Sequence, residues 1–204
     1  MSSFIMNTYN RYPVSFVNGK GSWLKSENGD DYLDFASGIA VNILGHNHPK
    51  LNKAMIENVD KIWHLSNLYK IPEQEKLAEK LCSLSFAEKV FFCNSGAEAV
   101  EGAIKVARKY FYSKGVTLRN EIITFSGSFH GRTLATLAAA GNPNYSEGFG
   151  PMPEGFISVP FADHDAFKRA INKNTAAVLL ETIQGEGGIR VLPDNCLKEI
   201  RKIC

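Results

Sequence analysis

The sequence predicts an α/β protein with a mainly parallel sheet. From about residue 48 onward, short apolar runs alternate with longer segments of helical spacing, which is the pattern of parallel strands joined by helices. The apolar runs are nearly continuous, as in strands buried on both faces. Residues 14–35 show a different pattern, in which short strand-like runs are separated by turns. We therefore expect an N-terminal arm over residues 1–47 and an α/β domain over 48–204.

The arm is predicted to contain short antiparallel strands. Asn18-Gly19 is a strong hairpin signal, and residues 27–30 form a second turn. The strands are expected at Val14–Val17, Trp23–Lys25 and Tyr32–Phe35.

The α/β part is predicted from hydrophobic spacing and from helix-start signals. The segment from Pro49 carries apolar residues close to helical spacing, and Pro72 lies near the start of another such segment. Helices are expected at 49–62, 72–84, 96–112, 131–140, 163–171 and 193–203, and strands at 89–93, 121–125, 157–159 and 177–181.

Composition excludes several classes of function. The chain has 204 residues, of which 44% are hydrophobic and 22% charged, with a net charge of +2. This charge gives no basis for binding nucleic acid or a membrane surface. No apolar run approaches the roughly 20 residues that span a bilayer, and the N-terminus does not resemble a signal peptide. We therefore expect a cytoplasmic protein.

No metal site is expected. The four cysteines form no CxxC pair, and none has a histidine at ligand spacing. His46 and His48 could share a face of a strand, but no third ligand is evident. A helix that begins at Pro49 explains this segment more simply.

Residues 94–98 form a turn between a predicted strand and a predicted helix. The first N–H groups of a helix lack partners within it and lie at the positive end of its dipole, so they can bind an anion. Gly96 would let such an anion approach the backbone closely. Ser95 and Glu98 also fit a capping box, which needs no ligand. The turn alone leaves both interpretations open.

A second motif, Ser128–Thr133, follows the strand predicted at 121–125. In a parallel sheet, ligands gather beyond the carboxyl ends of the strands, so this loop and Ser95 are expected at the same edge. Phe129 could lie over a flat heteroaromatic ring, and Arg132 could hold a carboxylate through two hydrogen bonds. Taken separately, a core phenylalanine and a solvated arginine are simpler explanations.

A third motif, Glu181–Gly188, follows another apolar strand. Its glycines are typical of a flexible loop. Its carboxylates could orient an amine or an arginine.

In combination these motifs resemble the class III pyridoxal-phosphate (PLP) aminotransferases, and within that class the acetylornithine aminotransferases. The resemblance runs over almost the whole chain in the same motif order, and it includes Gly38–Asn42, Leu44–His46 and Ser66–Tyr69. It implies the PLP-dependent transferase fold type I, with residues 48–204 as the first part of the large, cofactor-binding domain.

The resemblance also implies roles for individual residues. Ser95, Gly96 and Ala97 would hold the PLP phosphate, and Phe129 would stack on the pyridine ring. Arg132 would bind a substrate carboxylate, Glu186 would face the incoming amino group, and Asn42 would lie near the substrate. Thr182 departs from the proline that many relatives carry, which should change the rigidity of the loop.

The implied reaction is transamination between N2-acetylornithine and 2-oxoglutarate, in arginine biosynthesis, by a homodimer. Ornithine, succinylornithine or 4-aminobutyrate are alternative amine substrates, and a non-catalytic remnant is a further alternative. The family's Schiff-base lysine and the aspartate that pairs with the pyridine nitrogen have no counterpart in this sequence. We therefore expect the 204-residue chain to be an incomplete, truncated part of the enzyme that is inactive by itself.

Overall fold

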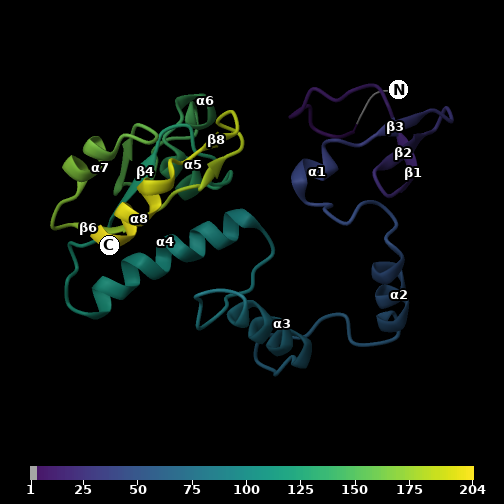
Figure 1. The fold of residues 1–204 in the computed structure, drawn as a ribbon, viewed down its shortest axis with the longest axis horizontal. Coiled ribbons are helices and arrows are strands. Elements are labelled where there is room, and N and C mark those ends of the chain that lie inside the picture. Colours follow the sequence, from purple (N-terminus) through teal and green to yellow (C-terminus); the bar gives the residue numbers. More distant parts are fainter. Residues whose placement is uncertain (1–3) are drawn as a thin grey trace. The chain divides into compact units, whose positions relative to one another are not determined.

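The computed structural model describes residues 4–204, and the chain divides into two compact units (Figure 1). The first unit ends at Glu79, and the second extends from Lys80 to Cys204. Each is described by itself. The predicted boundary between an arm (1–47) and a cofactor-binding domain (48–204) is a different kind of division, because it separates parts by their expected role. It stays a prediction.

The first unit contains a three-stranded antiparallel sheet in the order β1-β2-β3, as predicted. The strands are β1 (Phe16–Lys20), β2 (Trp23–Ser26) and β3 (Asp31–Leu33).

The predicted hairpin turn at Asn18-Gly19 is wrong, because both residues lie inside β1. The chain reverses at Gly21 and Ser22, since Lys20 pairs with Trp23 and Gly21 has a φ of +58°. Gly19 has a different reason to be glycine. A Cβ there would lie 2.9 Å from the Cβ of His46, so the close approach of this side chain leaves no room for one.

Three helices follow this sheet. They are α1 (Ser37–Ala40), α2 (Pro49–Asn58) and α3 (Pro72–Ser83), which ends just inside the second unit. α2 is shorter than the predicted 49–62, whereas α3 closely matches its predicted range. α1 has no counterpart among the predicted elements. It is a turn of left-handed backbone, and this conformation is costly for a β-branched residue such as Ile39, whose φ is +63°.

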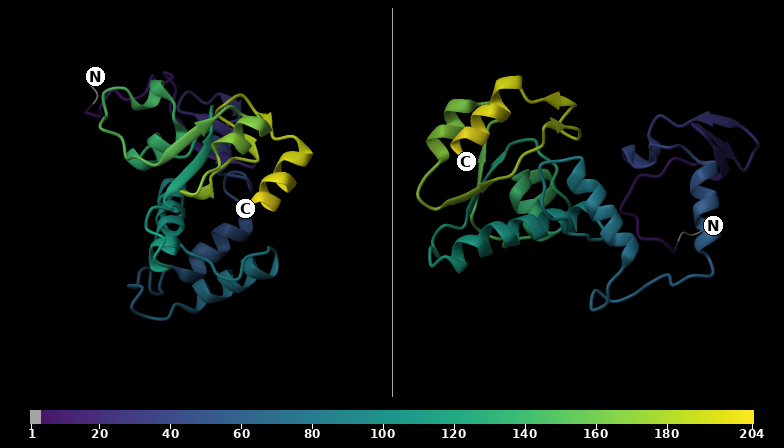
Figure 2. Two further views of the ribbon diagram at one scale, coloured as in Figure 1. Left: turned by 90° about the vertical axis from the view of Figure 1, so that its left-hand side faces the viewer. Right: turned by 60° about the horizontal axis from the view of Figure 1, so that its bottom comes forward.

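The second unit is built on a parallel sheet in the order β5-β4-β6. The central strand β4 (Glu121–Phe125) lies where predicted, between β5 (Phe156–Val159) and β6 (Thr175–Val178). Helices cover both faces of this sheet (Figure 2). The predicted α/β architecture with a parallel sheet is therefore confirmed for this unit.

The helices of the second unit are α4 (Gly96–Ser113), α5 (Leu134–Ala140), α6 (Pro143–Ser146), α7 (His164–Ala170) and α8 (Asp194–Ile203). α5 begins later than predicted because Thr133 caps it, with its hydroxyl accepting from the N–H of Thr136. A small antiparallel hairpin, β7 (Ile183–Gln184) with β8 (Arg190–Val191), was not among the predicted elements.

The core of the second unit lies between the sheet and the helices α7 and α8. Successive residues of a strand point to opposite faces, so Ile123 and Phe125 of β4 share one face. This face packs against Phe167 of α7 and Ile200 of α8. Such burial anchors β4 and thereby the loop that leaves its carboxyl end.

The strand predicted at Lys89–Cys93 is wrong. The segment is not assigned to a strand, and no residue of the described chain pairs with it. Phe91, which the prediction placed in a buried strand, is 75% exposed. Apolar sequence alone suggested a strand here, but a strand also requires a hydrogen-bonding neighbour.

Candidate functional site

The N-terminus of α4 offers a group of unpaired backbone donors. Ser95 is the N-cap residue, and its hydroxyl accepts from the N–H of Glu98 at 3.2 Å. Glu98 does not complete the capping box, because its carboxylate accepts from the backbone N–H of Asn94 at 2.7 Å instead. The N–H groups of Ser95, Gly96 and Ala97 consequently make no hydrogen bond to any described residue. Apart from its chain neighbours and its own helix backbone, no atom lies within 4 Å of a Cβ built on Gly96, so the side-chain position of this residue is open.

The loop after β4 lies against this helix end. A Cβ on Gly131 would lie 2.9 Å from the Cβ of Ala97, so the two backbones meet at van der Waals distance. Thr133 adds a second connection, since its hydroxyl donates to Glu101 of α4 at 2.6 Å. The structure therefore brings the Ser128–Thr133 motif next to the 94–98 turn, as the sequence predicts.

Phe129 and Arg132 form a cluster with two further side chains, Tyr145 and Glu186. The Phe129 and Tyr145 rings meet edge to face, with centroids 6.5 Å apart and an interplanar angle of 88°. The Arg132 Cζ lies 5.5 Å from the centroid of the Phe129 ring and 5.0 Å from that of Tyr145. The Tyr145 hydroxyl donates to Glu186 Oε1 at 3.0 Å. The Phe129 side chain is 38% exposed, so it is not the core phenylalanine of the simpler explanation.

Arg132 keeps its hydrogen-bonding capacity. Within the part of the chain that the structure describes, it makes no hydrogen bond and no ion pair, and its guanidinium lies over the rings of Phe129 and Tyr145. A guanidinium in this state can still bind a carboxylate through two parallel hydrogen bonds.

Tyr145 was not predicted as a site residue. It lies in the short helix α6, where no periodic pattern singles it out. The hydrogen bond to the Glu186 carboxylate, together with burial, raises the pKa of its hydroxyl above 10.0. The aromatic ring in a polar, glycine-rich segment is the one local signal that could have drawn attention to it.

Two polar side chains, Gln184 and Glu181, fix the backbone around Phe129. Gln184, which is fully buried, donates to the carbonyl of Ser126 and to the Ser128 hydroxyl, both at 3.1 Å. The N–H of Phe129 donates to Glu181 Oε2 at 3.0 Å. The third motif of the sequence, Glu181–Gly188, therefore supports the second one. The neighbouring His130 is also buried, and burial lowers the pKa of its imidazole.

Asn42 belongs to the first unit. Its amide donates to His46 Nδ1 at 3.1 Å, and His46 Nε2 donates to Asp34 Oδ2 at 2.8 Å. The Ser37 hydroxyl donates to the Asn42 carbonyl at 2.9 Å. These contacts hold Asn42 just after the strained turn α1, and they occupy both ring nitrogens of His46. The hydrogen bond from His46 is the main reason why the pKa of Asp34 lies below its ordinary 3.8.

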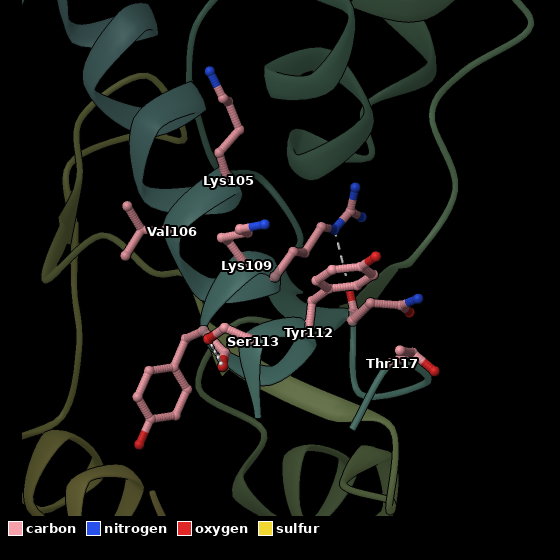
Figure 3. Close-up of a pocket in the computed structure, with 9 residues that line it drawn as sticks. Lys105, Val106, Lys109, Tyr112, Ser113 and Thr117 are labelled. Carbon is pink, nitrogen blue, oxygen red and sulfur yellow. Dashed lines mark hydrogen bonds between the residues drawn. The ribbon is translucent and has the colours of Figure 1, made fainter. Parts of the chain in front are cut away.

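A separate hollow of about 890 Å³ lies along the second half of α4 (Figure 3). Lys105, Lys109 and Tyr112 are among the residues that line it. This hollow shares no residue with the cluster around Phe129 and Arg132. We therefore treat it as separate from the candidate site, although it is large.

The cluster combines unpaired helix amides, an exposed aromatic ring, a free guanidinium and a carboxylate. This set suits a flat phosphorylated ring together with a substrate that carries an amine and a carboxylate. Comparison with known proteins agrees with that chemistry, because residues 4–204 match the family described as "Aminotransferase class-III". The chain belongs to the class III aminotransferases.

Its relatives in this family include acetylornithine aminotransferases. The chain is 56% identical over 200 residues to the one from Agrobacterium fabrum, and 52% identical over 204 residues to the one from Rhodobacter capsulatus. These alignments cover 98% and 100% of the chain but only 50% and 52% of the relatives. The chain thus spans about half the length of the curated relatives it matches.

Solved structures of aminotransferases share the fold. An ornithine aminotransferase from Toxoplasma gondii, with partial occupancy of PLP at its active site, matches with a TM-score of 0.93 at 27% identity. It is aligned over 98% of this chain and 48% of its own. The N-acetylornithine aminotransferase from Stenotrophomonas maltophilia matches with a TM-score of 0.80 at 38% identity, over 95% of this chain and 48% of its own. The chain thus has the predicted PLP-dependent fold type I over the part that corresponds to about half of these structures.

None of the helices between residues 4 and 204 is long and apolar enough to cross a membrane.

Proposed function

We propose that the protein carrying this chain is a PLP-dependent aminotransferase that transfers the terminal amine of N2-acetylornithine to 2-oxoglutarate. The observation that carries the proposal is the cluster of Phe129, Arg132 and Glu186 beside the unpaired amides of α4. Acetylornithine aminotransferases that are 52–56% identical to the chain support the choice of substrate.

The residues present fit the cofactor. The N–H groups of Ser95, Gly96 and Ala97 would donate to the phosphate, and the positive end of the α4 dipole would favour its charge. The exposed ring of Phe129 would contact one face of the pyridine ring. PLP supplies the electron-withdrawing ring that amine transfer requires. No lysine among these 204 residues is assigned to the covalent attachment of PLP.

The remaining residues would bind and orient the substrates. The Arg132 guanidinium would hold a carboxylate, and the Glu186 carboxylate would face the incoming amino group. Asn42 would lie near the substrate. Glu181, through the N–H of Phe129, keeps the loop in place while these groups act.

The proposal extends to the whole protein. Residues 1–47 would form an arm, and residues 48–204 would contribute to the cofactor-binding domain. The protein would be a homodimer in the cytoplasm. Light scattering after gel filtration measures the oligomeric state, and a monomer in the presence of PLP would contradict the dimer.

The function is tested by expressing the complete reading frame and the 204-residue chain side by side. Each is supplied with PLP, 2-oxoglutarate and one amine, and glutamate formation is measured. We expect the complete product to prefer N2-acetylornithine and the 204-residue chain to show no turnover. An Arg132→Lys variant should raise the KM for 2-oxoglutarate by about tenfold or more, because lysine cannot reproduce the planar two-pronged contact.

Ornithine is the second candidate substrate, because the structure from Toxoplasma gondii with the TM-score of 0.93 is an ornithine aminotransferase. The same assay with ornithine, succinylornithine and 4-aminobutyrate separates the candidates. A clear preference for unacetylated ornithine would overturn the first choice, and no turnover with any amine would favour a non-catalytic remnant.

A further inference from the structure

Tyr145 lies between two groups of opposite charge. Its hydroxyl donates to the Glu186 carboxylate at 3.0 Å, and its ring lies 5.0 Å from the Cζ of Arg132. One side chain therefore contacts both groups that the proposed function assigns to the substrate.

Arg132 and Glu186 do not pair with each other. No ion pair within 4.0 Å joins them among the described residues, although both contact Tyr145. A direct pair would be the simplest way for two such charges to interact. It would also occupy the guanidinium that a substrate carboxylate needs, and a substrate would first have to break it.

We propose that Tyr145 is a positioning residue that holds Glu186 away from Arg132 and so keeps the guanidinium available for a substrate carboxylate. The inference rests on the proposed function for the identity of the substrate, a dicarboxylate such as 2-oxoglutarate. The inference states that the contact between Tyr145 and Glu186 controls carboxylate binding at Arg132. This effect on binding can be measured without turnover.

Three observations support this role. The Glu186 carboxylate raises the pKa of Tyr145, so the hydroxyl keeps its proton at neutral pH and can donate. The Tyr145 ring is fixed by its edge-to-face contact with Phe129, and its backbone N–H donates to the carbonyl of Asn142 at 3.1 Å. The guanidinium of Arg132 makes a cation–π contact with the Tyr145 ring, and its N–H groups donate to no acceptor among residues 4–204.

The test is a double-mutant cycle in the product of the complete reading frame. Tyr145→Phe removes only the hydroxyl, which releases Glu186 to pair with Arg132. We expect this variant to raise the KM for 2-oxoglutarate about tenfold, with a smaller effect on kcat. Adding Glu186→Gln removes the competing charge, so the double variant should bind 2-oxoglutarate as well as Glu186→Gln alone.

The matched control is Tyr110→Phe. The Tyr110 hydroxyl also contacts a charged group, accepting from Lys114 Nζ at 2.7 Å, but it lies outside the cluster. The Tyr110→Phe variant should therefore leave the KM for 2-oxoglutarate unchanged. A purely structural role of Tyr145 would impair Tyr145→Phe and the double variant equally, and that result would overturn the proposal, as would an unchanged KM in Tyr145→Phe.

Binding of glutarate, which cannot accept an amine, separates this inference from the proposed function. Calorimetric titration of the four proteins of the cycle should show the same tenfold weakening in Tyr145→Phe and the same rescue by Glu186→Gln. This pattern in a protein that transaminates none of the amines would reject the proposed function and support the role of Tyr145. The opposite result is transamination by the unmutated protein together with equal glutarate affinity in the unmutated protein and in Tyr145→Phe. This result would support the proposed function and reject the role of Tyr145.

Discussion

Gly131 is the residue at which two of the predicted motifs meet. It has a φ of +128°, and a Cβ on it would lie 2.9 Å both from the Cβ of Ala97 and from Oγ1 of Thr136. Both its backbone conformation and its surroundings therefore require glycine. A side chain here would push the loop that carries Phe129 away from the N-terminus of α4.

We predict that Gly131→Ala destabilises the second unit by about 1–3 kcal/mol through overpacking, in addition to roughly 1–3 kcal/mol of backbone strain. It should also weaken PLP binding. Gly148→Ala is the control, because Gly148 has a φ of +79° with nothing within 4 Å of its Cβ position, so it reports the strain alone. Chemical denaturation measures both variants, and equal losses of stability would show that the contact with Ala97 is unimportant.

Asp34 connects the small sheet of the first unit with the segment around Asn42. One carboxylate oxygen accepts from His46 Nε2 at 2.8 Å, and the other accepts from the N–H groups of Ala36 and Ser37. These hydrogen bonds favour the ionised carboxylate, with the bond from His46 as the largest contribution, and lower its pKa below 3.8.

This shift predicts an acid-labile first unit. A carboxyl whose pKa is lower in the folded state contributes stability that is fully present above its unfolded pKa and is lost as the pH falls through the folded pKa. The free energy of unfolding of the first unit should therefore decrease as the pH falls below about 3.8. Asp34→Asn should remove this part of the pH dependence, and Asp30→Asn, whose side chain makes no described contact, should retain it. Carbon NMR of the Asp34 carboxyl checks the pKa directly, and a titration at or above 3.8 would contradict the prediction.

At the scale of elements, the β7–β8 hairpin is held to the loop after β4 by Gln184. This side chain is fully buried, donates to Ser126 and Ser128, and accepts from Arg190 Nη2 at 2.5 Å. A Cβ on Gly187 would lie 2.5 Å from the carbonyl oxygen of Gly127, so the two loops are also in close backbone contact. The hairpin thereby fixes the position of Glu186 relative to Phe129.

We expect Gln184→Leu to cost about 1–3 kcal/mol, because it leaves buried partners without a hydrogen bond. The carboxylate affinity of the site should fall with it, since Glu186 would lose its fixed position. Ile183→Ala, on the exposed side of the same strand, is the control and should change neither quantity much. Denaturation and glutarate titration measure the two effects, and a stable Gln184→Leu protein with normal glutarate binding would refute this account of the hairpin.

Hydrophobic spacing predicted the elements whose own sequence carries a regular apolar pattern. α3, α4 and β4 lie close to their predicted ranges because their apolar faces are long and regular. The turn at Asn18-Gly19 failed because the local signal did not include the His46 side chain packed over Gly19. The strand at 89–93 failed because pairing depends on a neighbour that the sequence pattern does not reveal.

For the candidate site, too, residues in local motifs could be predicted, whereas contacts between distant segments could not. Phe129, Arg132 and Glu186 could be predicted because each lies in a recognisable motif, and the structure brings these three together. Tyr145 could not, because its contact with Glu186 joins residues that are 41 positions apart. A contact of this kind depends on how the loops fold over the sheet edge, and neither residue's local sequence encodes it.

At the scale of the whole molecule, the two units differ in how they are stabilised. The second has a core of buried apolar side chains from β4, β5, α7 and α8. Among the described residues of the first unit, Ser26 alone is buried. Its strands leave large side chains such as Trp23 about half exposed. The first unit is therefore held mainly by backbone pairing and by the hydrogen bonds of Asp34 and His46.

We predict that backbone amides exchange with solvent at very different rates in the two sheets. Amides of β4 should exchange more than about tenfold more slowly than those of β1, β2 and β3, because exposed ladders with little apolar packing open locally. Deuterium exchange followed by mass spectrometry of peptides from each strand measures this on the 204-residue chain. Equal protection of the β2 and β4 amides from exchange would contradict this prediction. It would indicate that the first unit is also stabilised by buried apolar side chains.

The loop at Phe129 has a consequence for protein engineering. Glu181 holds this loop through the backbone N–H of Phe129, and Gln184 holds it through Ser126 and Ser128, so none of these hydrogen bonds involves the phenyl ring. The side chain at position 129 can therefore be exchanged for another aromatic ring while the loop keeps its path. Under the proposed function, variants with tyrosine or tryptophan at this position should change the affinity for PLP while the loop keeps its hydrogen bonds to Glu181 and Gln184.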